Sequence, residues 1–126
     1  MSTNKEFNEQ LCQRTFAVSV RMVKVTQALP NNRAGWKIGD QAIRSGTAIG
    51  ALCEEAMSGL SYRDFIHGMR MCRKETKETL FWLRLIIACG LMPEQRLKIL
   101  IKEIDEIASI LTAIVKTGEQ KLNNVS

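Results

Sequence analysis

Residues 44–83 read RSGTAIGALCEEAMSGLSYRDFIHGMRMCRKETKETLFWL, and this stretch decides the fold of the chain. Its first part lines one helical face with small residues, so another helix can approach it closely. Gly46 and Gly50 lie about one turn apart, and each lowers helix propensity by roughly 1 kcal/mol relative to alanine. A close helix crossing would explain both. The second part predicts the seam of a helix bundle, because residues suited to a core recur at alternating steps of four and three. The seam consists of Phe65, Met69, Cys72, Thr76, Thr79, Leu83 and Ile86.

Two helices therefore meet in this stretch, at a turn near Gly59. The first is expected to begin within residues 33–38 and to end at residue 57 or 58, with Gly59 as its left-handed cap. Ser61, with an aspartate three positions later, resembles a capping box and predicts the start of the next helix. Gly90 is expected to end that helix.

One more helix is predicted on the N-terminal side. Apolar residues recur at helical spacing over residues 7–29, and Pro30 ends the pattern. A second apolar row on this helix, which includes Phe16, predicts contact with more than one neighbour. Arg14 and Arg21 lie on the opposite side, where they are expected either to face solvent or to join a subunit contact.

The fourth helix is predicted to start at Pro93, and its two apolar rows again exceed what one neighbour would cover. The chain turns polar after residue 117, which indicates a frayed tail at 119–126. We therefore expect one domain at 1–118 and a polar tail at 119–126. Leucine is expected to be far more damaging in place of Gly50 than in place of Gly118, because only Gly50 is assigned to a close crossing.

The composition favours a small all-α protein. The chain has 126 residues, of which 45% are hydrophobic and only 6% aromatic, and it contains two prolines. Lysine and arginine total 18 against 13 acidic residues, so the net charge of +5 favours weak attraction to polyanions. Neither a signal peptide nor a membrane span is predicted, so a cytoplasmic location is expected. The four cysteines show no C-x-x-C spacing and are expected to be buried free thiols.

The sequence contains no constellation typical of an enzyme. A di-iron bundle needs two E-x-x-H motifs, and this chain has a single histidine. The same count argues against a zinc site. Arg63 and His67 come one residue short of an R-x4-H ribonuclease motif. We therefore expect no catalytic residues, no metal and no cofactor.

Two sets of charged residues are the candidates for function. A structural ion pair is expected between Arg44 and a carboxylate of Glu55, Glu75 or Glu78, across the second and third helices. On the third helix a basic stripe recurs at helical spacing, formed by Arg63, His67, Arg70, Lys74, Lys77 and Arg84. Three interpretations of this stripe stay open. It faces solvent, it binds phosphates, or it contacts acidic residues of the fourth helix of an adjacent subunit (Glu103, Asp105, Glu106).

Several short motifs together resemble a known family. They are R-S-G-T-A-I-G-A at 44–51, E-E-A at 54–56, Ser61, D-F-I-H at 64–67, K-E at 74–75, E-T at 78–79 and W-L at 82–83. In combination they resemble the four-helix-bundle proteins of 23S ribosomal RNA intervening sequences. The resemblance implies an antiparallel up-down-up-down bundle, assembled into a ring that is a homopentamer in known members, with no enzymatic activity. Relatives include accessory proteins of diversity-generating retroelements, which implies RNA or DNA and a reverse transcriptase as partners.

One position departs from the family pattern. Leu52 stands where the family usually has asparagine, so a polar network involving Glu55 is in doubt. Two hypotheses for function follow. The chain is a non-enzymatic oligomeric bundle that contacts RNA or a nucleic-acid-bearing partner through basic faces, or it is a structural or protein-binding scaffold whose charges keep it in solution.

Overall fold

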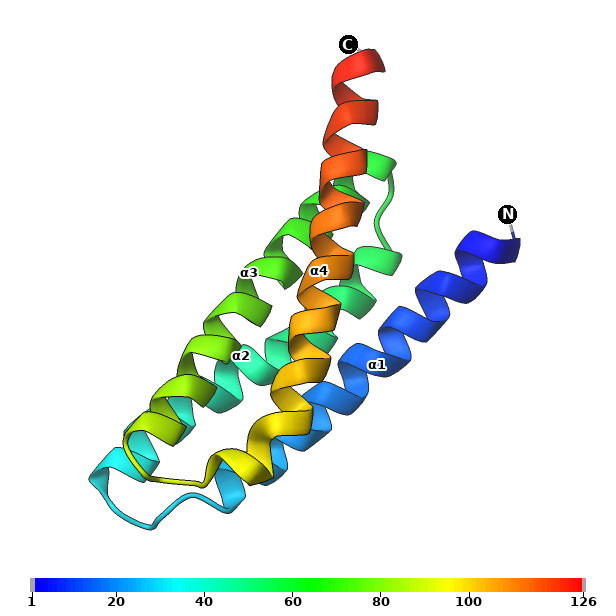
Figure 1. Ribbon diagram of the computed structural model, residues 1–126. Helices are drawn as coiled ribbons and strands as arrows, with labels where there is room; N and C mark the ends of the chain where they lie inside the picture. The colour runs from blue at the N-terminus through cyan, green and yellow to red at the C-terminus, as the bar shows by residue number, and fades with distance from the viewer. Residues whose placement is uncertain (1, 126) are drawn as a thin grey trace.

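The computed structural model describes residues 2–125, which form four helices and no strand. The helices are α1 (Ser2–Gln27), α2 (Arg33–Met57), α3 (Tyr62–Ala88) and α4 (Glu94–Val125). Consecutive helices run antiparallel and lie side by side, with the α1–α2 and α3–α4 connections at one end of the bundle and the α2–α3 connection at the other (Figure 1). The prediction of an all-α four-helix bundle is confirmed.

The helix ends follow local sequence signals. The Ser61 side chain accepts a hydrogen bond from the backbone N–H of Asp64 at 3.1 Å, which confirms the predicted N-cap of α3. Gly90 has a φ of 71° and ends the turn after α3, as predicted. The prediction of a left-handed Gly59 is wrong, because Gly90 is the only described residue with positive φ. The N–H of Ser58 bonds to the last carbonyls of α2 instead, so the chain turns without a left-handed residue.

The α1–α2 crossing is as close as the two glycines predict. A Cβ on Gly46 would lie 2.5 Å from Cγ of Met22, and a Cβ on Gly50 would lie 2.6 Å from Oγ of Ser19. Both approaches are too short for any side chain beyond hydrogen. The Ser19 hydroxyl donates to the Gly46 carbonyl at 2.9 Å and accepts from the Gly50 N–H at 3.0 Å. One side chain thus ties the two backbones together at the point of contact.

The predicted seam of α3 is buried, with one exchange. Phe65 is only half-buried, and Ile66 is fully buried in its place. The reason lies on α4: a Cβ on Gly118 would lie 2.2 Å from Cδ1 of Ile66, so the absent side chain makes room for the isoleucine. Gly118 is therefore a buried packing position, and the expectation that only Gly50 lies at a close crossing is wrong.

The polar C-terminal stretch also differs from the prediction. Helix α4 continues as far as Val125, so segment 119–126 is helical over all of its described residues, and Ser126 lies outside them. Glu119 forms an ion pair with Arg70 of α3, which gives this last part of the helix a contact with the bundle. A helix that emerges from a packed domain can propagate through residues that are themselves polar.

Helices α1 and α4 diverge. Their ends near the two connections lie close together, whereas the N-terminal half of α1 leans away from the C-terminal half of α4 (Figure 1). Part of the second apolar row of α1 is consequently left uncovered: Phe16 is 59% and Val20 38% exposed. On α4, Ile99 is 73% exposed. The four helices of one chain therefore leave apolar side chains uncovered on α1 and α4.

Candidate nucleic-acid interface

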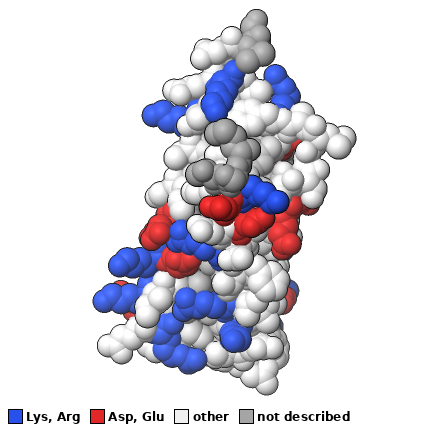
Figure 2. Space-filling model, turned by 90° about the vertical axis from the view of Figure 1, so that its right-hand side faces the viewer, with Lys and Arg blue, Asp and Glu red and all other residues white. Residues whose placement is uncertain are grey.

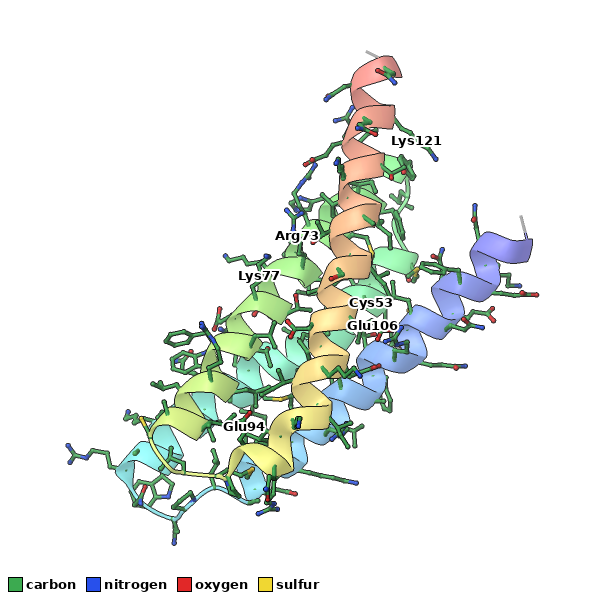
Figure 3. The ribbon with its side chains drawn as sticks, in the orientation of Figure 1. Cys53, Arg73, Lys77, Glu94, Glu106 and Lys121 are labelled. Carbon is green, nitrogen blue, oxygen red and sulfur yellow. The ribbon has the colours of Figure 1, made fainter. Side chains whose placement is uncertain are left out.

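The basic stripe of α3 supplies four exposed cations that form no ion pair within the described chain. Arg63, Lys74, Lys77 and Arg84 are all exposed, and among the residues that the structure describes none of the four forms an ion pair. Arg84 lies over the ring of Phe81 at 6.0 Å, a cation–π contact that leaves its charge in place. Lys77 and the half-buried Arg73, one turn apart, both come from α3 (Figure 3). These four exposed cations, together with Arg73, are called the α3 basic face below.

Two predicted members of the stripe have other surroundings. Arg70 is half-buried and donates from Nε to Oε2 of Glu119 at 3.0 Å, so its charge is compensated within the chain. His67 is exposed and lines a groove of about 350 Å³ between α2 and α3, together with Leu52 and Glu55. The six residues of the predicted stripe therefore do not act as one set. The groove, with two acidic residues in its lining, offers no surface for phosphate.

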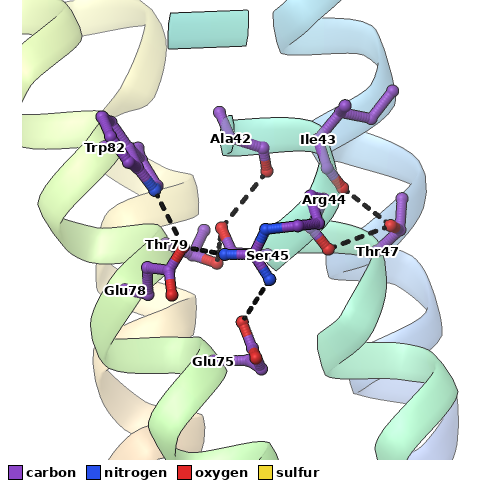
Figure 4. A network of polar contacts seen from close by, with 9 residues as sticks. All are labelled: Ala42, Ile43, Arg44, Ser45, Thr47, Glu75, Glu78, Thr79 and Trp82. Carbon is purple, nitrogen blue, oxygen red and sulfur yellow. Dashed lines mark hydrogen bonds and ion pairs between the residues drawn. The ribbon is translucent and has the colours of Figure 1, made fainter. Parts of the chain in front are cut away.

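Two of the three acidic residues of α3, Glu75 and Glu78, join a network with α2, and the third, Asp64, is exposed. Arg44 donates from Nη2 to Oε2 of Glu78 and from Nη1 to Oε1 of Glu75, the latter at 3.5 Å (Figure 4). Trp82 donates from its indole N–H to the same Oε2 of Glu78 at 3.2 Å. The bond from Trp82, followed by the bond and charge of Arg44, holds the pKa of Glu78 below its usual range. Glu78 is thus a carboxylate engaged by Arg44 of α2, and the charge of Lys74, one turn earlier on α3, also lowers its pKa.

A buried hydrogen-bond chain lies beside this network. Thr79 donates to Oγ of Ser45 at 2.9 Å, and Ser45 donates to the carbonyl of Ala42 at 3.4 Å (Figure 4). Both hydroxyls are fully buried. Glu55, the third residue predicted for the polar network, lies outside it and is exposed. Leu52, in place of the asparagine of the family pattern, is half-buried beside it in the α2–α3 groove.

The acidic residues of α4 are engaged within the chain. Arg14 donates from Nε to Oε2 and from Nη2 to Oε1 of Glu103, and from Nη2 to Oε1 of Glu106, each at 2.9 Å. Arg14 is therefore paired within the chain, although its side chain stays 31% exposed, and the pattern of α1 alone gave no signal of this pairing. A contact of the basic stripe with Glu103, Asp105 and Glu106 of an adjacent subunit therefore loses support, because Glu103 and Glu106 are already paired with Arg14.

The side of the molecule that carries α1 has a different charge pattern. Figure 2 shows acidic side chains in a band across the middle of this side, with basic ones gathered below it toward the two connections. Figure 3 places Glu106 between α4 and α1, in agreement with its bond to Arg14. This side thus alternates in sign. Along α3, by contrast, Lys74, Lys77 and Arg84 follow one another with no exposed acidic residue between them, whereas the exposed Asp64 adjoins Arg63.

The remaining predicted features concern thiols, metals and membranes. Cys53 and Cys72 are buried and Cys12 is half-buried, but Cys89 is exposed, which the sequence interpretation did not expect. Cys89 caps the C-terminus of α3, beyond the last core position at Ile86. Within residues 2–125, no three His, Cys, Asp or Glu residues are grouped as a metal site would require. None of the described helices combines the length and apolar character of a membrane span.

Comparison with known proteins places this fold in a family. The sequence profile described as "23S rRNA-intervening sequence protein" matches residues 8–113. A crystal structure from Bacteroides thetaiotaomicron, titled as a protein of unknown function from the S23 ribosomal protein family, superposes with a TM-score of 0.79 at 30% sequence identity. The match covers 84% of this chain and 98% of that one. A search of curated proteins finds no match. The chain belongs to the family of 23S rRNA-intervening sequence proteins.

Proposed function

We propose that this protein is a non-enzymatic bundle that binds RNA through the α3 basic face. The observation that carries the proposal is the separation of charge on α3. Its exposed cations form no ion pair among the described residues, while Glu75 and Glu78 are each paired with Arg44 of α2. Lysine and arginine side chains free to meet phosphates are what non-specific nucleic-acid binding requires.

RNA is the nucleic acid to test first. The family is named for intervening sequences of 23S rRNA, and the chain carries a net charge of +5. Binding that depends on phosphate contacts weakens steeply with salt, because each contact releases condensed counterions. Fluorescence anisotropy of a labelled RNA fragment, measured at several salt concentrations, therefore tests the proposal. An RNA affinity that does not change with salt would contradict it.

A second property belongs to the same proposal: the protein is a homo-oligomer, and the family resemblance implies a pentameric ring. The exposed apolar side chains of α1 and α4, Phe16 and Ile99 among them, support association, since large uncovered apolar surface favours contact between chains. Light scattering at micromolar concentration measures the oligomeric state. A monomer would remove the ring from the proposal and leave RNA binding to be judged separately.

The competing function is a protein scaffold that uses the same apolar surface and binds no nucleic acid. Exposed apolar side chains at Phe16, Trp36 and Phe81 favour it, because they suit a protein partner as well as a second copy. The two functions differ in one measurable respect. Both a scaffold and an RNA-binding bundle form an oligomer. Only the RNA-binding bundle has an affinity for RNA that falls with salt.

A further inference from the structure

Two cysteine thiols lie in contact across the α1–α2 crossing. Sγ of Cys12 and Sγ of Cys53 are 3.6 Å apart, although 41 positions separate them in the sequence. A disulfide has an S–S distance of about 2.05 Å, so the sulfurs need to approach by only about 1.5 Å. The other two thiols have different surroundings: Cys72 donates to the carbonyl of Ile49, and Cys89 is exposed at the end of α3.

The pair can be reached through a groove beside Cys12. Cys12 is half-buried and lines a groove of about 690 Å³ between α1 and α2, together with Lys5, Glu9, Glu54 and Met57. Cys53 is fully buried behind it. A small oxidant can therefore reach the sulfur of Cys12, while Cys53 reacts only with what Cys12 has bound. This is the arrangement of an attacking and a resolving cysteine.

Both thiols are protonated at neutral pH. Burial is the main cause that raises the pKa of Cys12, and it raises the pKa of Cys53 to about 12. Because the thiolate is the reactive form, the pair is stable as a dithiol until an oxidant is supplied. The low thiolate fraction makes oxidation slow at neutral pH, so it is expected to be faster at higher pH.

We propose that Cys12 and Cys53 are a redox modification site that closes into an intrachain disulfide when the protein meets a low-molecular-weight disulfide such as oxidised glutathione. The Cys12 thiolate attacks one sulfur of the oxidant, whose S–S bond breaks and releases one glutathione thiolate. That thiolate takes the proton of Cys53, whose sulfur then attacks Cys12 and releases the second glutathione. Two protein thiols are oxidised and one external disulfide is reduced.

The disulfide would act on the part of α1 that has least support. The chain links α1 to α2 at the other end of the bundle, and the N-terminal half of α1 leans away from α4 (Figure 1). A bond from Cys12 to Cys53 holds this half of α1 to α2 covalently. Closing a loop of about 40 residues restricts the unfolded chain, and the melting temperature is expected to rise by roughly 10 °C.

The experiment uses the purified full chain, reduced and then treated with oxidised glutathione at about pH 8, where a larger share of Cys12 is ionised. Intact mass and peptide mapping report the product. We expect the loss of two hydrogen atoms, a Cys12–Cys53 cross-linked peptide, and the higher melting temperature, all reversed by dithiothreitol. Cys53→Ser is expected to stop at Cys12 carrying one glutathione, because no resolving thiol remains.

Cys89→Ser is the matched control, since it removes an exposed thiol outside the pair and should leave the cross-link unchanged. A wild-type protein that carries glutathione on Cys12 without forming the cross-link would overturn the proposal. A cross-link between Cys53 and Cys72 would also overturn it. None of these results depends on RNA binding, so the redox site and the proposed function are judged independently.

Discussion

The guanidinium of Arg14 on α1 meets the carboxylate of Glu103 on α4 through two parallel hydrogen bonds of 2.9 Å each. A further bond from Arg14 reaches Glu106. The bonds and charges of these glutamates raise the pKa of Arg14, so the arginine is charged at every pH at which the protein folds. We call Arg14, Glu103 and Glu106 the clamp. It joins α1 to α4, two helices that diverge toward the N-terminus of α1 (Figure 1).

Removing this clamp should loosen the first helix from the last. Arg14→Ala is expected to lower the free energy of unfolding by about 1 to 2 kcal/mol, because a partly buried bidentate pair is lost and Glu103 keeps only the charge of Arg21 nearby. Arg33→Ala, which removes an exposed arginine without an ion pair, should change it by less than about 0.5 kcal/mol. Urea denaturation measures both values. Equal losses for the two variants would show that the clamp adds no stability.

The same pair predicts a dependence of stability on pH. The bond from Arg14 is the first cause that lowers the pKa of Glu103 in the folded protein. A carboxyl with a lowered folded pKa adds stability above its unfolded pKa, and this contribution is lost as the pH falls through the folded value. Glu103→Gln should therefore lose stability at neutral pH but approach the wild type at pH values well below 4.5. A stability difference that stays constant over this titration would contradict the assignment.

The buried bond between Thr79 and Ser45 can be tested with a double-mutant cycle. Ser45→Ala leaves the Thr79 hydroxyl buried without its acceptor, which should cost about 1 to 3 kcal/mol. Thr79→Val removes the donor while keeping the shape. The double variant should be less destabilised than the sum of the two single ones, because no buried hydroxyl is then left unpaired. Additive losses, measured by urea denaturation, would show that the two hydroxyls are energetically independent.

The glycine contacts predict which positions reject a larger side chain. Gly50→Leu should lower the free energy of unfolding by about 2 to 3 kcal/mol, because the new side chain enters the contact with Ser19. Gly118→Leu should be damaging as well, since its Cβ would already overlap Ile66. Ala51→Leu is the control, because Ala51 is exposed beside Gly50. If Ala51→Leu and Gly50→Leu melted at the same temperature, the close crossing would be in another place.

How far the sequence predicts this molecule depends on the range of each interaction. The cap at Ser61 and the turn at Gly90 could be predicted because the signal lies within a few residues of its effect, and the close crossing because Gly46 and Gly50 lie about one turn apart on one helix. The contact of Ile66 with Gly118 and the clamp of Arg14 could not, because they depend on how α1, α3 and α4 are rotated about their axes. A helical repeat gives the spacing of residues on one helix, but not the residues that face it from another.

The candidate site shows the same limit. The sequence predicted the spacing of basic residues on α3, and it also predicted that Arg44 lies opposite an acidic residue of α3. The sequence did not predict that members of the stripe would differ in their partners. Arg70 is paired with Glu119, which lies in the stretch predicted to be a polar tail. Only the packed structure separates exposed cations from compensated ones.

The α3 basic face is the central claim, and reversing its charge tests it most directly. The variant combines Lys74→Glu, Lys77→Glu and Arg84→Glu, three exposed residues without ion pairs among the described residues. Its control makes the same change of charge on α1 and α2, by Lys5→Glu, Arg33→Glu and Lys37→Glu, which are also exposed and unpaired in the described chain. Light scattering of both variants first establishes that assembly is unchanged.

The measurement is the slope of log affinity for RNA against log salt concentration, for the wild type and both variants. Each lost contact with a single-stranded phosphate is expected to reduce the slope by about 0.7. The α3 variant should therefore bind RNA more weakly, with a slope smaller by roughly 2, while the control stays close to the wild type. Equal affinities and slopes for the wild type and the α3 variant would contradict the account.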